Sequence, residues 1–182
     1  MPADRTEWRI TTHSEAETRH VGAVLGTLLQ PGDVIALIGP LGAGKTRLVQ
    51  GIAQGLGIDR PVTSPTFILM NLYPSPNGHT LCHIDCYRFR DPVEEGYEMG
   101  LDQQLGSEDI CVVEWAERIA ALLPPDHLTI TIEPMDETLR HLTFRAGGPR
   151  SRALLNALVA QLTTGGNPDH AGDRREGSRS NP

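Results

Sequence analysis

The feature that most constrains the fold of this chain is a glycine-rich turn between a short apolar run and a helical pattern. Residues 34–38, Val-Ile-Ala-Leu-Ile, form an unbroken apolar run, which is typical of a strand buried on both faces of a sheet. The segment 39–46, Gly-Pro-Leu-Gly-Ala-Gly-Lys-Thr, follows directly and matches the phosphate-binding loop pattern. Apolar residues then recur at helical spacing from Leu48 to Leu56. A strand, this loop and a helix in succession predict a site for nucleotide phosphates.

Each part of the loop has a chemical role in this interpretation. Gly42 and Gly44 let the backbone curl so that successive amides point inward, Lys45 reaches the terminal phosphates, and the Thr46 hydroxyl joins a Mg²⁺ shell. A chance glycine turn before a helix is the alternative. The buried strand in front of the loop favours the phosphate site.

The remaining pattern predicts a three-layer α/β domain of the P-loop NTPase-like kind, with a mixed, partly antiparallel sheet. The sequence predicts a capped helix from Ser14 to Leu29, a strand hairpin at 67–73 and 80–85, a helix from Asp91, a buried strand at 110–114, a strand pair at 127–133 and 138–145, and a helix at 153–162. The polar stretch 163–182 has almost no apolar residues and is expected to be disordered. We therefore expect a single domain over residues 1–162.

The composition and charge of the chain limit which partners and compartments we expect for it. The chain has 182 residues, and its formal charge of −7 argues against a broad basic face for gripping nucleic acid. No stretch approaches the roughly 20 apolar residues that would cross a bilayer, so we expect no membrane partner. Three cysteines fit a reducing compartment, and no secretory signal is seen at the N-terminus. We expect the cytoplasm.

Two carboxylates end predicted strands and are candidates for the chemistry. Glu114 follows four apolar residues, so we expect a central strand beside the loop strand and a role on the metal side. Asp85 ends a more polar strand, which suits a residue that positions or deprotonates an attacking water or hydroxyl. The structural alternative is a capping carboxylate, or an ion pair with Arg88 or Arg90 in the case of Asp85.

Two further stretches are ambiguous. Thr-Ser-Pro-Thr at 63–66 is either a plain turn or a switch whose hydroxyls face the terminal phosphate. The segment 79–86 contains two histidines and two cysteines, which suggests zinc. On a strand, however, Cys82 and Cys86 would lie about 13 Å apart, too far for one tetrahedral ion. Small buried hydrophobic side chains are the simpler interpretation of the cysteines.

Taken together, the motifs resemble one known family. The chain carries the phosphate loop, Thr-Ser-Pro-Thr-Phe at 63–67, His-Ile-Asp-Cys-Tyr-Arg at 83–88, the acidic segment 91–105 and Ile-Cys-Val-Val-Glu-Trp at 110–115. In this order and spacing they resemble the TsaE family, also called YjeE, the ATPases of bacterial tRNA threonylcarbamoyladenosine synthesis. The resemblance runs from the first predicted helix to the second predicted hairpin.

The resemblance implies an activity and partners. It implies that the protein binds ATP and Mg²⁺ and hydrolyses ATP, weakly in isolation. It also implies work with TsaB and TsaD, where TsaD catalyses the transfer of threonylcarbamoyl to the adenosine beside the anticodon. Contact with tRNA would then be indirect, through the complex.

The resemblance also assigns residues. The implied phosphate-binding residues are Leu41, Gly42, Ala43, Gly44, Lys45 and Thr46. Thr46 and Glu114 would hold Mg²⁺, and Asp85 would be the catalytic carboxylate. Ser64 and Thr66 would belong to the switch, and Glu15 and Arg140 match the adenine-side positions loosely. Trp115 follows the metal carboxylate as in the family, although an ordinary core aromatic would look the same.

Two other functions use the same loop. A small P-loop kinase would use Asp85 as base for a substrate hydroxyl, but no arginine-rich lid is evident. A nucleotide-sensing switch would bind ATP to control association, with incidental hydrolysis. The sequence alone does not separate this switch from a working ATPase.

Overall fold

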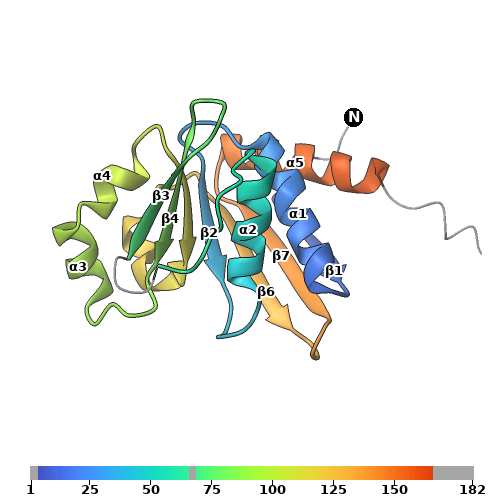
Figure 1. Cartoon of the computed structure of the whole chain (residues 1–182), viewed down its shortest axis with the longest axis horizontal. Coiled ribbons are helices and arrows are strands. Elements are labelled where there is room, and N and C mark those ends of the chain that lie inside the picture. Colours follow the sequence, from blue (N-terminus) through green and yellow to red (C-terminus); the bar gives the residue numbers. More distant parts are fainter. Residues whose placement is uncertain (1–3, 66–68, 166–182) are drawn as a thin grey trace, which may run out of the picture.

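One seven-stranded sheet with helices on both faces makes up the protein (Figure 1). The structure is a computed structural model that describes residues 4–65 and 69–165. The strands are β1 Glu7–Thr12, β2 Val34–Ile38, β3 Met70–Pro74, β4 Thr80–Asp85, β5 Ile110–Glu114, β6 Leu128–Pro134 and β7 Arg140–Ala146. The helices are α1 Glu15–Leu28, α2 Lys45–Gly55, α3 Pro92–Glu98, α4 Leu101–Leu105, the 3₁₀ helix η1 Ala116–Leu122 and α5 Pro149–Thr164.

The sheet is mixed, as predicted. Its strand order is β1-β7-β6-β2-β5-β4-β3. The four inner strands β6, β2, β5 and β4 run parallel to their neighbours within this group, whereas β3, β7 and β1 pair antiparallel. The predicted central position of the Glu114 strand is confirmed, since β5 lies between β2 and β4.

Alternating strand residues feed two separate cores, and this makes the three layers. Ile35 and Leu37 of β2 pack into a core with residues of α1, α2 and α5. Val34 and Ala36 of the same strand pack on the other face, with residues of α4 and η1. A strand with neighbours on both sides and helices on both faces has no solvent-facing side, which explains its unbroken apolar sequence.

Strand β1 is absent from the sequence-based prediction. It lies at the edge of the sheet and pairs antiparallel with β7. Within Glu7–Thr12 only Trp8 and Ile10 are apolar, and both pack against the core beneath α1 and α5. A six-residue edge strand with two inward apolar side chains gives too weak a periodic signal to be separated from a polar N-terminus.

The ends of the helices largely follow the predicted signals. Ser14 caps α1 by accepting a hydrogen bond from the Glu17 amide at 3.1 Å. Glu17 itself accepts from the His13 amide at 2.6 Å, one residue earlier than a capping box requires. Helix α5 extends beyond the predicted 153–162 at both ends. Of the stretch predicted to be disordered, residues 166–182 lie outside the described part of the chain.

Helices α1 and α2 approach so closely that only glycine fits at four positions. A Cβ atom on Gly51 would lie 2.1 Å from the carbonyl oxygen of Arg19, and one on Gly55 would lie 2.1 Å from that of Ala23. Gly22 and Gly26 meet the backbone of α2 in the same way. The contact fixes the start of α1 beside the start of α2, where the phosphate loop ends. Among the described helices, none is long and apolar enough to cross a membrane.

Candidate nucleotide site

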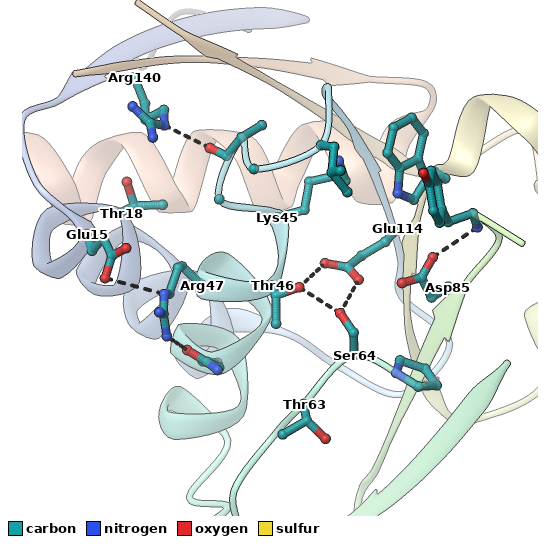
Figure 2. Close-up of a pocket in the computed structure, with 18 of the residues that line it drawn as sticks. Glu15, Thr18, Lys45, Thr46, Arg47, Thr63, Ser64, Asp85, Glu114 and Arg140 are labelled. Atoms are coloured by element: carbon teal, nitrogen blue, oxygen red, sulfur yellow. Dashed lines mark hydrogen bonds and ion pairs between the residues drawn. The ribbon is translucent and has the colours of Figure 1, made fainter. Parts of the chain in front are cut away.

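A cavity of about 890 Å³ opens where the parallel strands end at their carboxyl side (Figure 2). This edge of a parallel sheet is where ligands bind in open α/β folds. The cavity is lined by residues of the phosphate loop, both strand-end carboxylates, the start of α1 and the β6–β7 turn. The predicted site residues that line it are Glu15, Leu41, Gly42, Ala43, Gly44, Lys45, Thr46, Ser64, Asp85, Glu114 and Arg140. Thr66 lies outside the described residues.

The phosphate loop has the backbone that its glycines predict. Gly42 and Gly44 have φ angles of 78° and 105°, in the left-handed region where a side chain would be strained. Lys45 folds back into the loop, and its Nζ donates to the carbonyl oxygens of Gly39 at 2.5 Å and Pro40 at 2.9 Å. Burial lowers the pKa of Lys45, and the negative charge of Glu114 partly opposes this effect.

Three oxygen-bearing side chains converge beside the loop. The Thr46 hydroxyl donates to Glu114 Oε1 at 2.8 Å and lies 2.9 Å from the Ser64 hydroxyl. Ser64 in turn donates to Glu114 Oε2 at 3.3 Å, as Figure 2 shows. These groups come from α2, from the segment before β3 and from the end of β5. Because hydroxyl and carboxylate oxygens are the ligands that Mg²⁺ prefers, the set fits this ion.

The two strand-end carboxylates are neighbours. Asp85 and Glu114 face each other in the β4–β5 register. Burial raises the pKa of Asp85, the amide of Tyr87 opposes this by donating to its Oδ1 at 3.0 Å, and the charge of Glu114 adds to the rise. Glu114 is more deeply buried, yet its contacts with His83 and Thr46 outweigh burial and lower its pKa. Glu114 therefore carries the charge of the pair more readily than Asp85 does.

The four inner residues of strand β4 are buried despite its polar sequence. His83 is fully buried, with its Nε2 3.3 Å from Glu114 Oε2 but not aligned for a hydrogen bond. Cys82 and Cys86 are also fully buried, in the core beneath α4 and η1. This confirms their interpretation as small hydrophobic side chains. The sequence suggests His83 only as a zinc ligand, because nothing local indicates its contact with Glu114.

An aromatic pair closes one side of the cavity. The Trp115 ring stacks on Tyr87 with centroids 4.9 Å apart, and Lys45 Nζ lies 4.1 Å from the Trp115 centroid. Trp115 has a φ of 56°, the single positive value among the described non-glycine residues. That strained backbone brings the ring beside Lys45, while part of the ring still packs against the core beneath α4 and η1. Trp115 is therefore part of the site, a role that sequence analysis could not separate from core packing.

The two residues matched to the adenine side both line the cavity but hold other groups. Glu15 pairs with Arg47 of α2 at 3.4 Å. Arg140 donates from Nε to the Ala43 carbonyl oxygen at 2.9 Å, and from Nη1 to that of Asp136 at 2.7 Å. Arg140 thus ties the phosphate loop to the β6–β7 turn. Glu137 and Thr138 of this turn also line the cavity, and they are not among the site residues predicted from the sequence.

Comparisons with known proteins agree on one family. The sequence model described as "Threonylcarbamoyl adenosine biosynthesis protein TsaE" matches residues 12–142. The chain is 39% identical to a protein of that name from Bacillus subtilis over 84% of this chain and 92% of the relative. It is also 39% identical to one from Treponema pallidum over 74% of this chain and 98% of the relative. The crystal structure of Bacillus subtilis YdiB superposes with a TM-score of 0.73 at 34% identity, covering 85% of this chain and 95% of YdiB. The protein therefore belongs to the TsaE family and has its P-loop NTPase-like fold.

Proposed function

We propose that this protein is a Mg²⁺-dependent ATPase of tRNA threonylcarbamoyladenosine biosynthesis. The observation that carries the proposal is the convergence of Thr46, Ser64 and Glu114 beside a complete phosphate loop, with Asp85 next to them. Its relatives' names supply the pathway. We further propose that the protein works in the cytoplasm with TsaB and TsaD and reaches tRNA only through them.

The proposed site divides the chemistry among the residues. Leu41 to Thr46 surround the phosphates, and Lys45 exchanges its loop carbonyls for the terminal phosphates. Thr46 and Glu114 would hold Mg²⁺, which neutralises phosphate charge when bound. Mg²⁺ sites of this kind use one or two protein carboxylates, and the substrate phosphates supply further ligands. Ser64 belongs to the same oxygen set, which supports the switch interpretation, and Thr66 is proposed with it.

Asp85 is the proposed catalytic carboxylate. A water oxygen bonds to the γ-phosphorus as the bond from that phosphorus to the bridging oxygen breaks, and the bond's electron pair stays on ADP. Asp85 accepts the proton that the water loses. Burial raises the pKa of Asp85, which makes its carboxylate a better proton acceptor near neutral pH than an exposed aspartate.

The experiment that tests the proposal is depletion of the protein, followed by measurement of threonylcarbamoyladenosine in bulk tRNA. We expect the modification to fall, and to recover with the wild-type gene. Complementation with Asp85→Asn distinguishes an ATPase from a sensing switch. A working ATPase requires hydrolysis, so Asp85→Asn should bind ATP and fail to restore the modification. Restoration by that variant would favour the switch, and unchanged modification after depletion would overturn the pathway.

The kinase alternative makes a different prediction for the same site. A kinase would transfer the γ-phosphoryl group to an added hydroxyl compound and would hydrolyse ATP slowly without it. The ATPase releases inorganic phosphate with no second substrate, and the partner proteins accelerate the release. Phosphate release measured with and without TsaB and TsaD therefore separates the two.

A further inference from the structure

Four cationic side chains line the cavity: Lys45, Arg47, Arg88 and Arg140. Three of them are already engaged, Lys45 and Arg140 by backbone carbonyls and Arg47 by a carboxylate. Arg88 differs from them. It is exposed, and within residues 4–65 and 69–165 its side chain makes no hydrogen bond or ion pair. The cavity thus holds one arginine whose guanidinium is available to an anion.

The backbone on both sides of Arg88 is held in place. Arg118, from η1, donates to the carbonyl oxygen of Tyr87 at 2.5 Å and also to that of Phe89. The Tyr87 amide is tied to Asp85 Oδ1, and the Phe89 side chain is buried in the core. The loop therefore presents an exposed side chain from a fixed backbone, three residues from the proposed catalytic carboxylate.

We propose that Arg88 is a catalytic residue of ATP hydrolysis that contacts the γ-phosphate and stabilises the charge that develops on it. This role rests on the proposed function. Phosphoryl transfer needs a cation at the equatorial oxygens of the transferred group, and an arginine in cis or in trans commonly supplies it. A planar guanidinium with five N–H donors suits those oxygens. Arg118 would then be a positioning residue that fixes the loop carrying Arg88.

With Arg88 in this role, the site has a group that can donate two hydrogen bonds to the transferred phosphoryl group. Lys45 neutralises charge on the terminal phosphates and Asp85 takes the proton, but neither donates two parallel hydrogen bonds to the moving phosphoryl group. The other two arginines of the cavity are engaged elsewhere: Arg140 donates to backbone carbonyl oxygens, and Arg47 contacts Glu15 and Gln50. A contact between Arg88 and a partner protein is the competing explanation for an exposed arginine, and the experiment below separates the two.

The test compares Arg88→Ala and Arg88→Lys with Arg90→Ala. Arg90 is an exposed arginine of the same loop that does not line the cavity. Single-turnover hydrolysis is measured with the protein in saturating excess over ATP, with and without TsaB and TsaD. Affinities are measured for ADP and for ADP with aluminium fluoride, which stands in for the transferred phosphoryl group. Thermal unfolding of each variant checks the fold.

We expect Arg88→Ala to slow hydrolysis about 10³-fold, the lower end for arginines of this kind. Its affinity for ADP should stay that of the wild type, because ADP lacks the γ-phosphate, while aluminium fluoride should no longer tighten ADP binding. Arg88→Lys keeps the positive charge but loses the planar guanidinium, so its hydrolysis rate should lie between those of the wild type and Arg88→Ala. Arg90→Ala should match the wild type in every assay.

The possible failures are distinguishable. A wild-type protein that hydrolyses no ATP, even with its partners, overturns the proposed function and the role of Arg88 with it. Wild-type hydrolysis with an equally fast Arg88→Ala overturns the role of Arg88 alone. A third result also overturns the catalytic role of Arg88: Arg88→Ala hydrolyses ATP slowly only with the partners and still binds ADP with aluminium fluoride like the wild type. Arg88 would then be a contact with a partner protein. If Arg88→Ala does not fold, the hydrolysis rate of Arg88→Lys and its affinity for ADP with aluminium fluoride test the role of Arg88 in the same way.

Discussion

The ammonium group of Lys45 lies 4.1 Å from the centroid of the Trp115 ring. Its donors are at the same time used by the carbonyl oxygens of Gly39 and Pro40. Trp115 holds this position with a left-handed backbone, a conformation that costs on the order of 1–3 kcal/mol. Bound phosphates would have to draw Lys45 away from the two carbonyls, and its contact with the ring would change with it.

Trp115 should therefore report nucleotide binding. The chain has two tryptophans, and the other, Trp8, lies on β1 against Phe144. In Trp8→Phe, whose emission comes from Trp115 alone, ADP or ATP should change the fluorescence, because the cation over the ring moves. In Trp115→Phe the emission of Trp8 should be unaffected by nucleotide. A nucleotide response that persists in Trp115→Phe would show that Lys45 and Trp115 are not the source.

Asp85 should lower the stability of the folded protein near neutral pH. Burial raises its pKa in the folded state. Below the ordinary value of about 3.9 the carboxyl is protonated in both states and has no effect. As the pH rises from there toward the raised value, the unfolded chain loses the proton first, so the free energy of unfolding falls. The loss is complete above the raised pKa.

Asp85→Asn removes this loss, because an amide does not ionise and its oxygen can still accept from the Tyr87 amide. Urea unfolding at pH 7.5 should show a gain of about 0.5–2 kcal/mol, the usual size of a stabilising single substitution. The gain should shrink as the pH approaches 4. Asp59→Asn, the same change at an exposed position outside the cavity, should stay within about 0.5 kcal/mol of the wild type. A less stable Asp85→Asn at pH 7.5 would contradict the argument.

Local patterns were enough to predict the centre of the fold. The β2 strand, the phosphate loop and α2 are adjacent in the chain, and each has a strong signal of its own. The two carboxylates could be placed because strands that run parallel bring their carboxyl ends to one edge. Strand β1 was missed because only two of its six residues are apolar, which leaves a weak periodic signal. Its pairing with β7, more than a hundred residues later, cannot be seen locally.

The finer geometry of the site depends on contacts that a single sequence does not reveal. Arg140 reaches Ala43 across 97 positions, and Thr46 reaches Glu114 across 68. The contact of Trp115 with Lys45 depends on one left-handed residue. Nothing in the residue types near Arg140 indicates that its guanidinium faces carbonyl oxygens. These features arise from tertiary packing and had to be observed.

The close contact of α1 and α2 predicts that Gly51→Ala destabilises the protein. In an isolated helix the change would be favourable by about 1 kcal/mol. Here the added Cβ would lie 2.1 Å from the Arg19 carbonyl oxygen, and overpacking of this kind costs about 1–3 kcal/mol or more. The sign of the change in urea unfolding therefore separates the two effects. Gly106→Ala is the control, since its nearest atom would be 3.6 Å away and its φ is −97°.

Arg140→Ala should weaken nucleotide binding through the phosphate loop. The Arg140 guanidinium holds the Ala43 carbonyl oxygen and the β6–β7 turn, and hydrogen bonds to a charged group contribute about 1.5–3 kcal/mol. Without them the loop is less ordered before binding, so the Kd for ADP should rise tenfold or more. Arg145→Ala, on the same strand, removes an exposed ion pair with Glu7 and should leave the Kd unchanged.

The choice of base separates this tether from a direct adenine contact. A tether acts on the phosphate loop, which every nucleotide uses, so Arg140→Ala should weaken ADP and GDP by the same factor. An adenine contact would be lost for ADP alone, and the variant would bind the two nucleotides with more similar affinities than the wild type does. Titration of both nucleotides against the wild type, Arg140→Ala and Arg145→Ala measures these factors. Because the guanidinium already donates to three backbone carbonyl oxygens through Nε and Nη1, we expect ADP and GDP to lose affinity equally.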